Sequence, residues 1–206
     1  MSLLIIWDWD NTLMNTRPAV KAGLQDLVNH HQLEPITDAD VFNVMTSHRG
    51  DFWKARFGDN IPDAVAYYVQ CYQQHADLVQ PFEHTLNILN RVRENNIRQV
   101  ILSNKNHASL VQEVARHQLT NYFDAILGTS GPLGKPDKAF VEPILEKFNP
   151  SKIVLIGDGI SDMLMAQNIN ATAILVHRPD ATDLPCHFSC ETLKDVDAVL
   201  TTHIFK

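Results

Sequence analysis

The feature that most constrains the fold is a short apolar run near the start of the chain that ends in two acids. Residues 3–7 read Leu-Leu-Ile-Ile-Trp, and Asp8 and Asp10 follow. Such a run is typical of a strand buried on both faces of a parallel sheet, and ligands bind at the carboxyl ends of such strands. Two neighbouring carboxylates repel each other, and a divalent cation such as Mg²⁺ relieves that repulsion. For this motif alone, the alternative is a strand followed by a turn whose acids are merely solvated.

Strands and helices alternate through the later part of the chain. Further apolar runs predict strands at 99–102, 123–127, 153–156 and 173–176. Helical periodicity lies between them, with a short helix from Met163 to Gln167 and a last helix at 191–200. This alternation predicts the α/β fold class, a Rossmann-like parallel sheet with helices on both faces.

Residues 16–80 have a different pattern, with helical periodicity, a break at residues 47–51, a longer helix from Pro62 to about Val79 and no strand candidate. The first strand belongs with the later strands, so the helical block is an insert after strand one. We therefore expect a core domain of residues 1–15 and 81–206 and an all-helical domain of residues 16–80.

The charge of the chain argues against nucleic acid and membrane surfaces as partners. The chain has 206 residues, 45% of them hydrophobic, and a formal net charge of −7. A negative chain is a poor ligand for nucleic acid or for an anionic membrane surface, and no apolar run approaches the ~18 residues of a membrane span. The three cysteines are sparse and follow no secretory signal, which predicts reduced thiols in a cytoplasmic protein. The oligomeric state stays open.

Polar residues that could form a site follow four of the predicted strands. The carboxyl ends of parallel strands lie on one edge of the sheet, so these residues are expected to meet there. Carboxylates that bind Mg²⁺, a lysine and a hydroxyl are the components of phosphoryl transfer. Asn106 is also expected to cap the helix after strand two. The residues at the strand ends are Asp8, Asp10, Ser103, Asn104, Lys135, Asp158 and Asp162.

These segments resemble the motifs of the haloacid dehalogenase-like hydrolases, in the family's order along the chain. The helical insert resembles the cap of the phosphoglycolate phosphatase-like branch. The matching stretches are Asp8-Trp-Asp10-Asn-Thr12, Ser103-Asn104-Lys105, Gly134-Lys135-Pro136-Asp137 and Gly157-Asp158-Gly-Ile-Ser-Asp162.

The resemblance implies a role for each acid. Asp8 would attack phosphorus and become an aspartyl phosphate, and Asp10 would act as general acid and then as general base. Mg²⁺ would be held by the carboxylates of Asp8 and Asp158 and by the backbone carbonyl of Asp10. Asp162 would support the metal shell or orient Lys135.

The resemblance also assigns the remaining polar residues. Ser103 would donate to a phosphoryl oxygen, and Lys135 would offset the negative charge of nucleophile and phosphate. Thr12 would shape the loop after the nucleophile, and both Thr12 and Asn104 are expected beside the substrate.

Asp10 narrows the reaction that the resemblance implies. Dehalogenases and phosphonatases of the family lack an acid at this position, so we expect a phosphatase of small phosphate monoesters. Sugar-phosphate mutases of the β-phosphoglucomutase type keep the acid but usually carry a histidine soon after motif one. Here that stretch, residues 17–21, reads Arg-Pro-Ala-Val-Lys. A mutase is thus the alternative, and a catalytically slow, phosphate-binding regulatory protein is another.

Substrate choice is expected to lie in the cap. His48 and Arg49 are close together between two predicted cap helices, and an arginine is suited to bind a carboxylate or a second anion of the substrate. The alternative is a solvated turn. The sequence leaves open whether the substrate is phosphoglycolate-like, a sugar phosphate or a nucleotide.

Overall fold

The computed structural model describes residues 2–46, 49–178 and 183–205. The chain divides into two compact units. One comprises Met1–Met14 and Phe82–Lys206, and the other comprises Asn15–Pro81.

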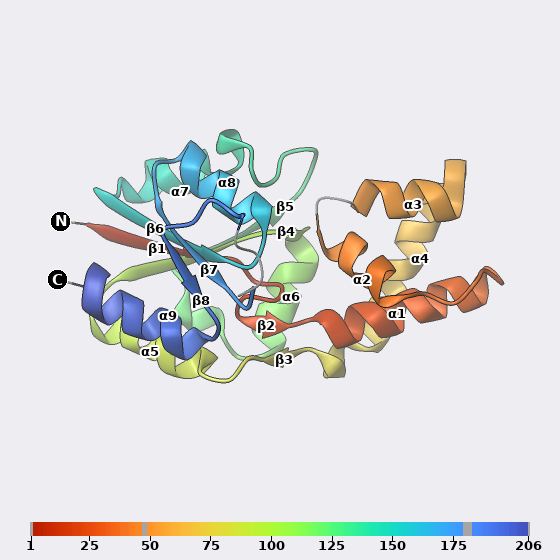
Figure 1. Ribbon diagram of the computed structural model, residues 1–206, viewed down its shortest axis with the longest axis horizontal. Helices are drawn as coiled ribbons and strands as arrows, with labels where there is room; N and C mark the ends of the chain where they lie inside the picture. The colour runs from red at the N-terminus through yellow and green to blue at the C-terminus, as the bar shows by residue number, and fades with distance from the viewer. Residues whose placement is uncertain (1, 47–48, 179–182, 206) are drawn as a thin grey trace. The chain divides into compact units, whose positions relative to one another are not determined.

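The first unit is built on a six-stranded sheet in the order β5-β4-β1-β6-β7-β8 (Figure 1). Every neighbouring pair is parallel, so the predicted α/β class with a parallel sheet is confirmed. Strand β8 was not predicted, because its three residues, Phe-Ser-Cys, are too few to show a strand pattern. The strands are β1 (Leu3–Trp7), β4 (Arg98–Asn106), β5 (Ala125–Thr129), β6 (Lys152–Gly157), β7 (Thr172–Val176) and β8 (Phe188–Cys190).

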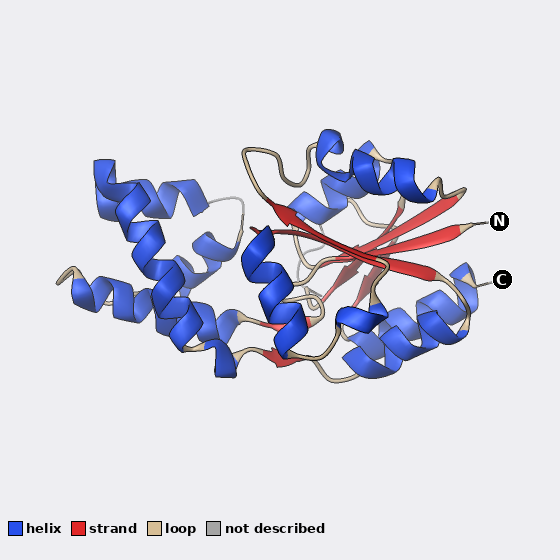
Figure 2. Cartoon of the chain, turned by 180° about the vertical axis from the view of Figure 1, so that it is seen from behind, coloured by secondary structure: helices blue, strands red, loops and turns tan. Residues whose placement is uncertain are grey.

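Helices cover both faces of this sheet (Figures 1 and 2). Helices α7 (Lys138–Phe148) and α8 (Ile160–Asn168) lie on one face. Helices α5 (Thr85–Glu94), α6 (His107–Arg116) and α9 (Leu193–Val199) lie on the other. Alternate residues of β1 therefore point to opposite apolar layers, with Leu4 and Ile6 in the layer of α7 and α8. A short 3₁₀ turn at Thr120–Tyr122 and a π-helical turn at Leu200–Ile204 complete this unit.

Strand β1 occupies the position that determines where the site forms. From β1 the chain proceeds outward to β4 and β5, then returns to β6 on the other side of β1. Trp7 pairs with both Ile101 and Ile156, and the backbone N–H of Asp8 donates to the Ile156 carbonyl at 2.9 Å. This reversal of strand order beside β1 is where open α/β sheets bind ligands, at the carboxyl ends of the strands.

Two element boundaries differ from the predicted ones at this edge. Strand β4 continues to Asn106, beyond the expected end at residue 102, with an irregular register between Leu102 and Asn106. Helix α8 begins at Ile160 rather than Met163 because Asp162 caps it from inside its first turn. The expected cap of α6 is confirmed, since the Asn106 side chain accepts the Ser109 N–H at 3.2 Å.

Within its described residues, the second unit has four α-helices around its own apolar core, with a 3₁₀ turn at Gly58–Asn60 between α3 and α4. Helix α3 begins at Arg49, where a break was expected, and α4 ends at Gln74, earlier than predicted, before a 3₁₀ turn at Ala76–Leu78. Short strands β2 (Met14–Asn15) and β3 (Gln80–Pro81) pair where the chain leaves and re-enters the first unit. Across the described ranges, no helix is both long and apolar enough to span a membrane. The helices are α1 (Arg17–His30), α2 (Asp38–Met45), α3 (Arg49–Phe57) and α4 (Ile61–Gln74).

Candidate active site

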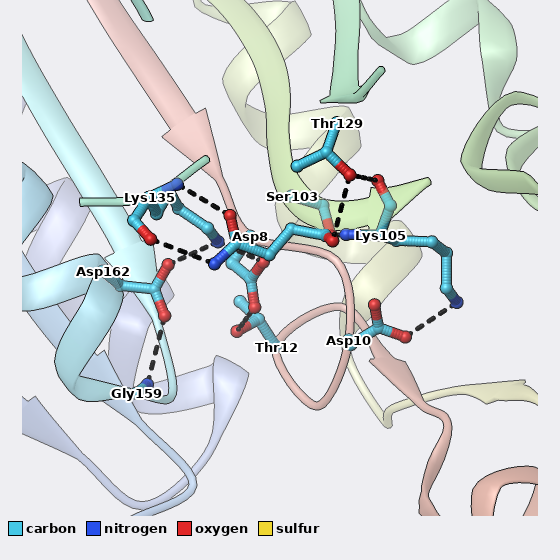
Figure 3. Close-up of polar contacts among 10 residues, drawn as sticks. Asp8, Asp10, Thr12, Ser103, Lys105, Thr129, Lys135, Gly159 and Asp162 are labelled. Carbon is cyan, nitrogen blue, oxygen red and sulfur yellow. Dashed lines mark hydrogen bonds and ion pairs between the residues drawn. The ribbon is translucent and has the colours of Figure 1, made fainter. Parts of the chain in front are cut away.

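A buried lysine joins two carboxylates at the carboxyl edge of the sheet (Figure 3). Lys135 Nζ lies 2.5 Å from Asp8 Oδ1 and 2.6 Å from Asp162 Oδ1. Asp8 directly follows β1, Lys135 lies in the loop between β5 and α7, and Asp162 lies in the first turn of α8. All three residues are at least nine-tenths buried. Three elements that are distant in sequence thus deliver one charged cluster.

Burial and charge shift the protonation equilibria of this cluster. The pKa of Asp8 is raised from 3.8 to about 7, first of all by burial and further by the charges of Asp162 and Asp10, while Lys135 opposes the increase. Burial also raises the pKa of Asp158, and the nearby carboxylates of Asp8 and Asp162 add to that increase. Burial alone would lower the pKa of Lys135, but the two carboxylates outweigh it and raise the pKa above its usual value. Lys135 therefore stays protonated at neutral pH.

The acids of this cluster fit a hard divalent cation. Asp8, Asp158 and Asp162 each present one carboxylate oxygen, and these oxygens lie within 4.8 Å of one another. Burial raises the pKa of Asp8 and of Asp158 first of all, and mutual repulsion among the acids raises both further. An all-oxygen donor set with excess negative charge suits Mg²⁺. The Asp10 carboxylate is not part of this group; the ligand that the resemblance implied for Asp10 was its backbone carbonyl.

Two hydroxyls lie beside the acidic cluster. Thr12 Oγ1 donates to Asp8 Oδ2 at 3.2 Å, so both oxygens of Asp8 have a protein partner. Ser103, which is buried, accepts the backbone N–H of Lys105 at 3.2 Å. Because that bond uses only the oxygen of Ser103, its hydroxyl proton can be donated to another acceptor.

Asn104 is bonded to the backbone of Lys135. Its Oδ1 accepts the Lys135 N–H at 2.7 Å, and its Nδ2 donates to the Lys135 carbonyl at 3.2 Å. Gly134 allows this contact, since a Cβ there would lie 2.7 Å from Asn104 Oδ1. The peptide bond from Lys135 to Pro136 is cis. Asn104 thus fixes the loop that carries the lysine, a contact that the sequence pattern did not indicate.

Asp162 is held from two sides. Its Oδ1 accepts from Lys135, and its Oδ2 accepts the Gly159 N–H at 3.1 Å at the start of α8. A Cβ on Gly157 would overlap the carboxyl group of Asp162. Glycine at 157 is therefore required for Asp162 to reach Lys135.

A second ion cluster was missed by the sequence analysis. Lys105 Nζ lies 2.8 Å from Asp10 Oδ1 and 2.8 Å from Glu113 Oε1, and Glu113 Oε1 also accepts Trp9 Nε1–H at 2.6 Å. Burial alone would lower the pKa of Lys105, but Asp10 and Glu113 raise it. One signal was available: Glu113 falls on the face of its helix that carries Leu110 and Val114, where an apolar residue is expected.

The helical unit contains the two residues that were predicted to bind substrate, His48 and Arg49. His48 lies outside the described residues, and Arg49 is described only by its backbone at the start of α3. Their contact with substrate stays a prediction. Trp53, from the same segment, is 5% exposed and belongs to the apolar core of the helical unit.

The sequence of this chain matches a known protein family. Residues 5–176 match the family model described as haloacid dehalogenase-like hydrolase. A phosphoglycolate phosphatase of Caulobacter vibrioides is 25% identical over 187 residues, covering 84% of this chain and 78% of the relative. The pyrophosphatase PpaX of Bacillus pumilus is 22% identical over 192 residues, covering 85% and 89%.

The fold is shared with solved structures at lower identity. The haloacid dehalogenase-like family protein SP0104 of Streptococcus pneumoniae superposes with a TM-score of 0.85 at 16% identity, covering 97% of this chain and 98% of that one. The family model spans most of the chain, from β1 through β7, and includes every strand that borders the acidic cluster. This chain belongs to the haloacid dehalogenase-like hydrolases.

Proposed function

We propose that this chain is a Mg²⁺-dependent phosphatase that hydrolyses a small phosphate monoester through an aspartyl phosphate on Asp8. The observation that carries the proposal is the buried Asp8 carboxylate, held by Lys135 at 2.5 Å within a group of three acids. A carboxylate nucleophile with a cationic partner and a metal site is the arrangement that phosphoryl transfer requires. The phosphatase names of two relatives support the reaction class.

The residues of the site divide the chemistry between them. An Asp8 oxygen forms a bond to phosphorus while the bond from phosphorus to the leaving oxygen breaks. Asp10 gives a proton to that leaving oxygen and then, as a carboxylate, takes a proton from the water that attacks the phosphoryl group and displaces Asp8. Ser103 donates to a phosphoryl oxygen, and Lys135 offsets the charge of nucleophile and phosphate.

The acidic cluster is the proposed Mg²⁺ site. Asp8 and Asp158 would hold the ion with the backbone carbonyl of Asp10, and Asp162 is in place to support them while it orients Lys135. When bound, Mg²⁺ polarises phosphoryl oxygens and neutralises their charge. Thr12 keeps Asp8 oriented through its hydrogen bond to Oδ2.

Hydrolysis is favoured over phosphoryl transfer between sugar positions. The stretch at residues 17–21 has no histidine, whereas the mutases that the chain resembles usually carry one there. Asp8, Asp10 and Lys135 together argue against a purely regulatory phosphate-binding protein, which needs no nucleophile and no acid.

The substrate is proposed to be small and anionic. The relatives named for phosphoglycolate and pyrophosphate support a substrate with a second anionic group. Arg49 is the proposed recognition residue, with His48. Arg49→Ala should lower kcat/KM for phosphoglycolate more than for phenyl phosphate, which has no second anion. Equal effects on both esters would remove this role from Arg49.

The test of the reaction is phosphate release from a panel of phosphate esters, with pyrophosphate, an anhydride, added for comparison. The esters are phosphoglycolate, sugar phosphates and nucleoside monophosphates, and each compound is assayed with Mg²⁺ and with EDTA. Asp8→Asn should abolish Mg²⁺-dependent release, while Asp63→Asn, a change at an exposed helix position, should leave it intact. Equal release by wild type and Asp8→Asn would contradict the mechanism. No release from any ester, with conversion of one sugar-phosphate isomer to another, would establish the mutase alternative.

A further inference from the structure

We propose that Lys105, anchored by the buried carboxylate of Glu113, is a positioning residue that holds Asp10 for proton transfer to the leaving group. This inference rests on the proposed phosphatase function. It adds two residues, Lys105 and Glu113, that act through Asp10 without touching substrate.

The first observation is the geometry of the lysine. Lys105 lies near the carboxyl end of β4, and its Nζ contacts Asp10 Oδ1 at 2.8 Å (Figure 3). The same Nζ contacts both oxygens of Glu113, at 2.8 and 3.0 Å. The Lys105 and Glu113 side chains are 12% and 7% exposed, whereas that of Asp10 is 29% exposed. The ammonium therefore links an accessible carboxylate to a buried one.

The second observation is the anchor. Glu113 Oε1 also accepts Trp9 Nε1–H at 2.6 Å. Trp9 lies between Asp8 and Asp10 in the sequence, and its side chain is fully buried. A single carboxylate on α6 thus holds both the lysine that contacts Asp10 and the residue that precedes Asp10. The segment that follows β1 is fixed to α6 at two points.

Stability alone is a weak explanation for this cluster. Burying a lysine with a glutamate costs desolvation energy, and a well-packed apolar pair in the same place is often equally stable or more so. Helix α6 has apolar residues, Leu110 and Val114, on the same buried face. The ion pair instead supplies a fixed donor beside Asp10, which apolar residues cannot do.

The chemical consequence concerns which oxygen carries the proton. Lys105 Nζ donates a hydrogen bond to Asp10 Oδ1, so Oδ1 acts as the acceptor. The proton that Asp10 transfers is therefore carried by Oδ2. As the bond from phosphorus to the leaving oxygen breaks and the bond to Asp8 forms, the Oδ2 proton goes to the leaving oxygen. Asp10 is then a carboxylate paired with the Lys105 ammonium. Without Lys105, the Asp10 side chain keeps its acid group but loses this orientation.

The experiment compares leaving groups with Lys105→Met. The measured quantity is kcat/KM, which reports the steps up to formation of the aspartyl phosphate. For the best alkyl phosphate of the panel, whose alkoxide needs a proton to leave, we expect a loss of roughly 10²-fold, the lower range for general acid catalysis. For p-nitrophenyl phosphate, whose leaving group needs no proton, we expect a loss of less than about threefold, because general acid catalysis contributes little there. Asp10→Asn should show the same dependence on leaving group, and adding Lys105→Met to it should change little.

A second variant covers the case in which Lys105→Met leaves Glu113 unpaired and does not fold. Lys105→Met with Glu113→Gln removes both buried charges, so no uncompensated carboxylate stays in the core, and it keeps an oxygen that can accept Trp9 Nε1–H. This double variant should show the same dependence on leaving group. Lys194→Met, at an exposed position of α9, is the matched control and should leave both rates unchanged.

The outcomes are distinguishable. Equal losses for alkyl and p-nitrophenyl phosphate, or wild-type rates with both, would overturn the positioning role while leaving the phosphatase function in place. Absence of Asp8-dependent phosphate release by the wild type would instead overturn the proposed function.

Discussion

Lys135 and Asp162 form a buried ion pair, with 2.6 Å between Nζ and Oδ1, and both side chains are only 3% exposed. The pair is asymmetric in charge because Asp8 shares the same ammonium and Asp158 lies close to both acids. Lys135 is therefore the buried cation that Asp8 and Asp162 share. Removing Lys135 makes the net charge of the cluster more negative, and adding a divalent cation makes it less negative.

Lys135→Met should reduce both activity and stability. Loss of the ammonium leaves the buried carboxylates of Asp8 and Asp162 without the cation that they share, and breaking a buried ion pair costs about 3–5 kcal/mol. We expect kcat to fall by at least ~10²-fold, as for loss of an electrostatic group at a reacting centre. Urea unfolding in EDTA and in Mg²⁺ measures the loss of stability, and Mg²⁺ should recover part of that loss. Lys138→Met, at an exposed position three residues on, should have neither effect, and equal behaviour of the two variants would contradict this role.

The stability of the metal-free protein should fall as pH rises from about 4 to about 7. The pKa of Asp8 is raised from 3.8 to about 7 in the folded state, so the folded protein binds more protons than the unfolded chain in this window. Stability falls with pH wherever the folded state binds more protons. The raised pKa of Asp158 has the same sign.

The measurement is the unfolding midpoint in EDTA at pH 5 and pH 8. The quantity to compare is the midpoint of Asp8→Asn minus the midpoint of wild type. This difference should be larger at pH 8 than at pH 5, because only the wild type loses stability when Asp8 ionises. Mg²⁺ should raise the wild-type midpoint at pH 8, since a ligand that binds only the folded state stabilises it, and should raise that of Asp8→Asn less. A midpoint difference independent of pH would show that Asp8 titrates normally.

Gly157→Ala should disrupt the site through Asp162. A Cβ at 157 overlaps the Asp162 carboxyl group, so Asp162 must move away from Lys135. We expect most of the phosphatase activity to be lost and the thermal midpoint to fall. Gly159→Ala is the matched control from the same loop, because its Cβ would approach Asp162 Oδ2 no closer than 3.5 Å. If Gly159→Ala is as damaging as Gly157→Ala, the loop itself rather than the Asp162 contact is responsible.

Trp53→Ala should destabilise the helical unit. The Trp53 ring is 5% exposed and lies 5.5 Å from the Phe57 ring and 5.6 Å from the Tyr68 ring, centroid to centroid. Truncating a buried tryptophan costs about 3–5 kcal/mol. Val69→Ala, at a position 37% exposed on α4, should cost less than about 1 kcal/mol. Urea unfolding followed by far-UV circular dichroism measures both, and similar losses would show that Trp53 is not part of the core.

Local patterns in the sequence were sufficient for the fold class and for the candidate residues at each strand end. Five apolar residues before Asp8, and similar runs before Ser103 and Asp158, predict buried parallel strands, and parallel strands bring their carboxyl ends to one edge. Asn106 as a helix cap was likewise predictable, because a cap depends on residues three positions apart.

Tertiary structure alone decided which side chains pair across that edge. Lys105 and Asp10 are 95 residues apart, and Trp9 and Glu113 are 104 residues apart. Periodicity assigns a residue to a face of a helix or strand, but it does not say which residue of another element it meets. It also could not show that Asn104 holds the backbone of Lys135, because that contact depends on a loop geometry with a glycine at 134. The sequence by itself determined the chemical groups at the edge of the sheet. The packing of α6 on β4 and β5, and of α8 on β6 and β7, together with the position of the lysine loop, determined how these groups are oriented.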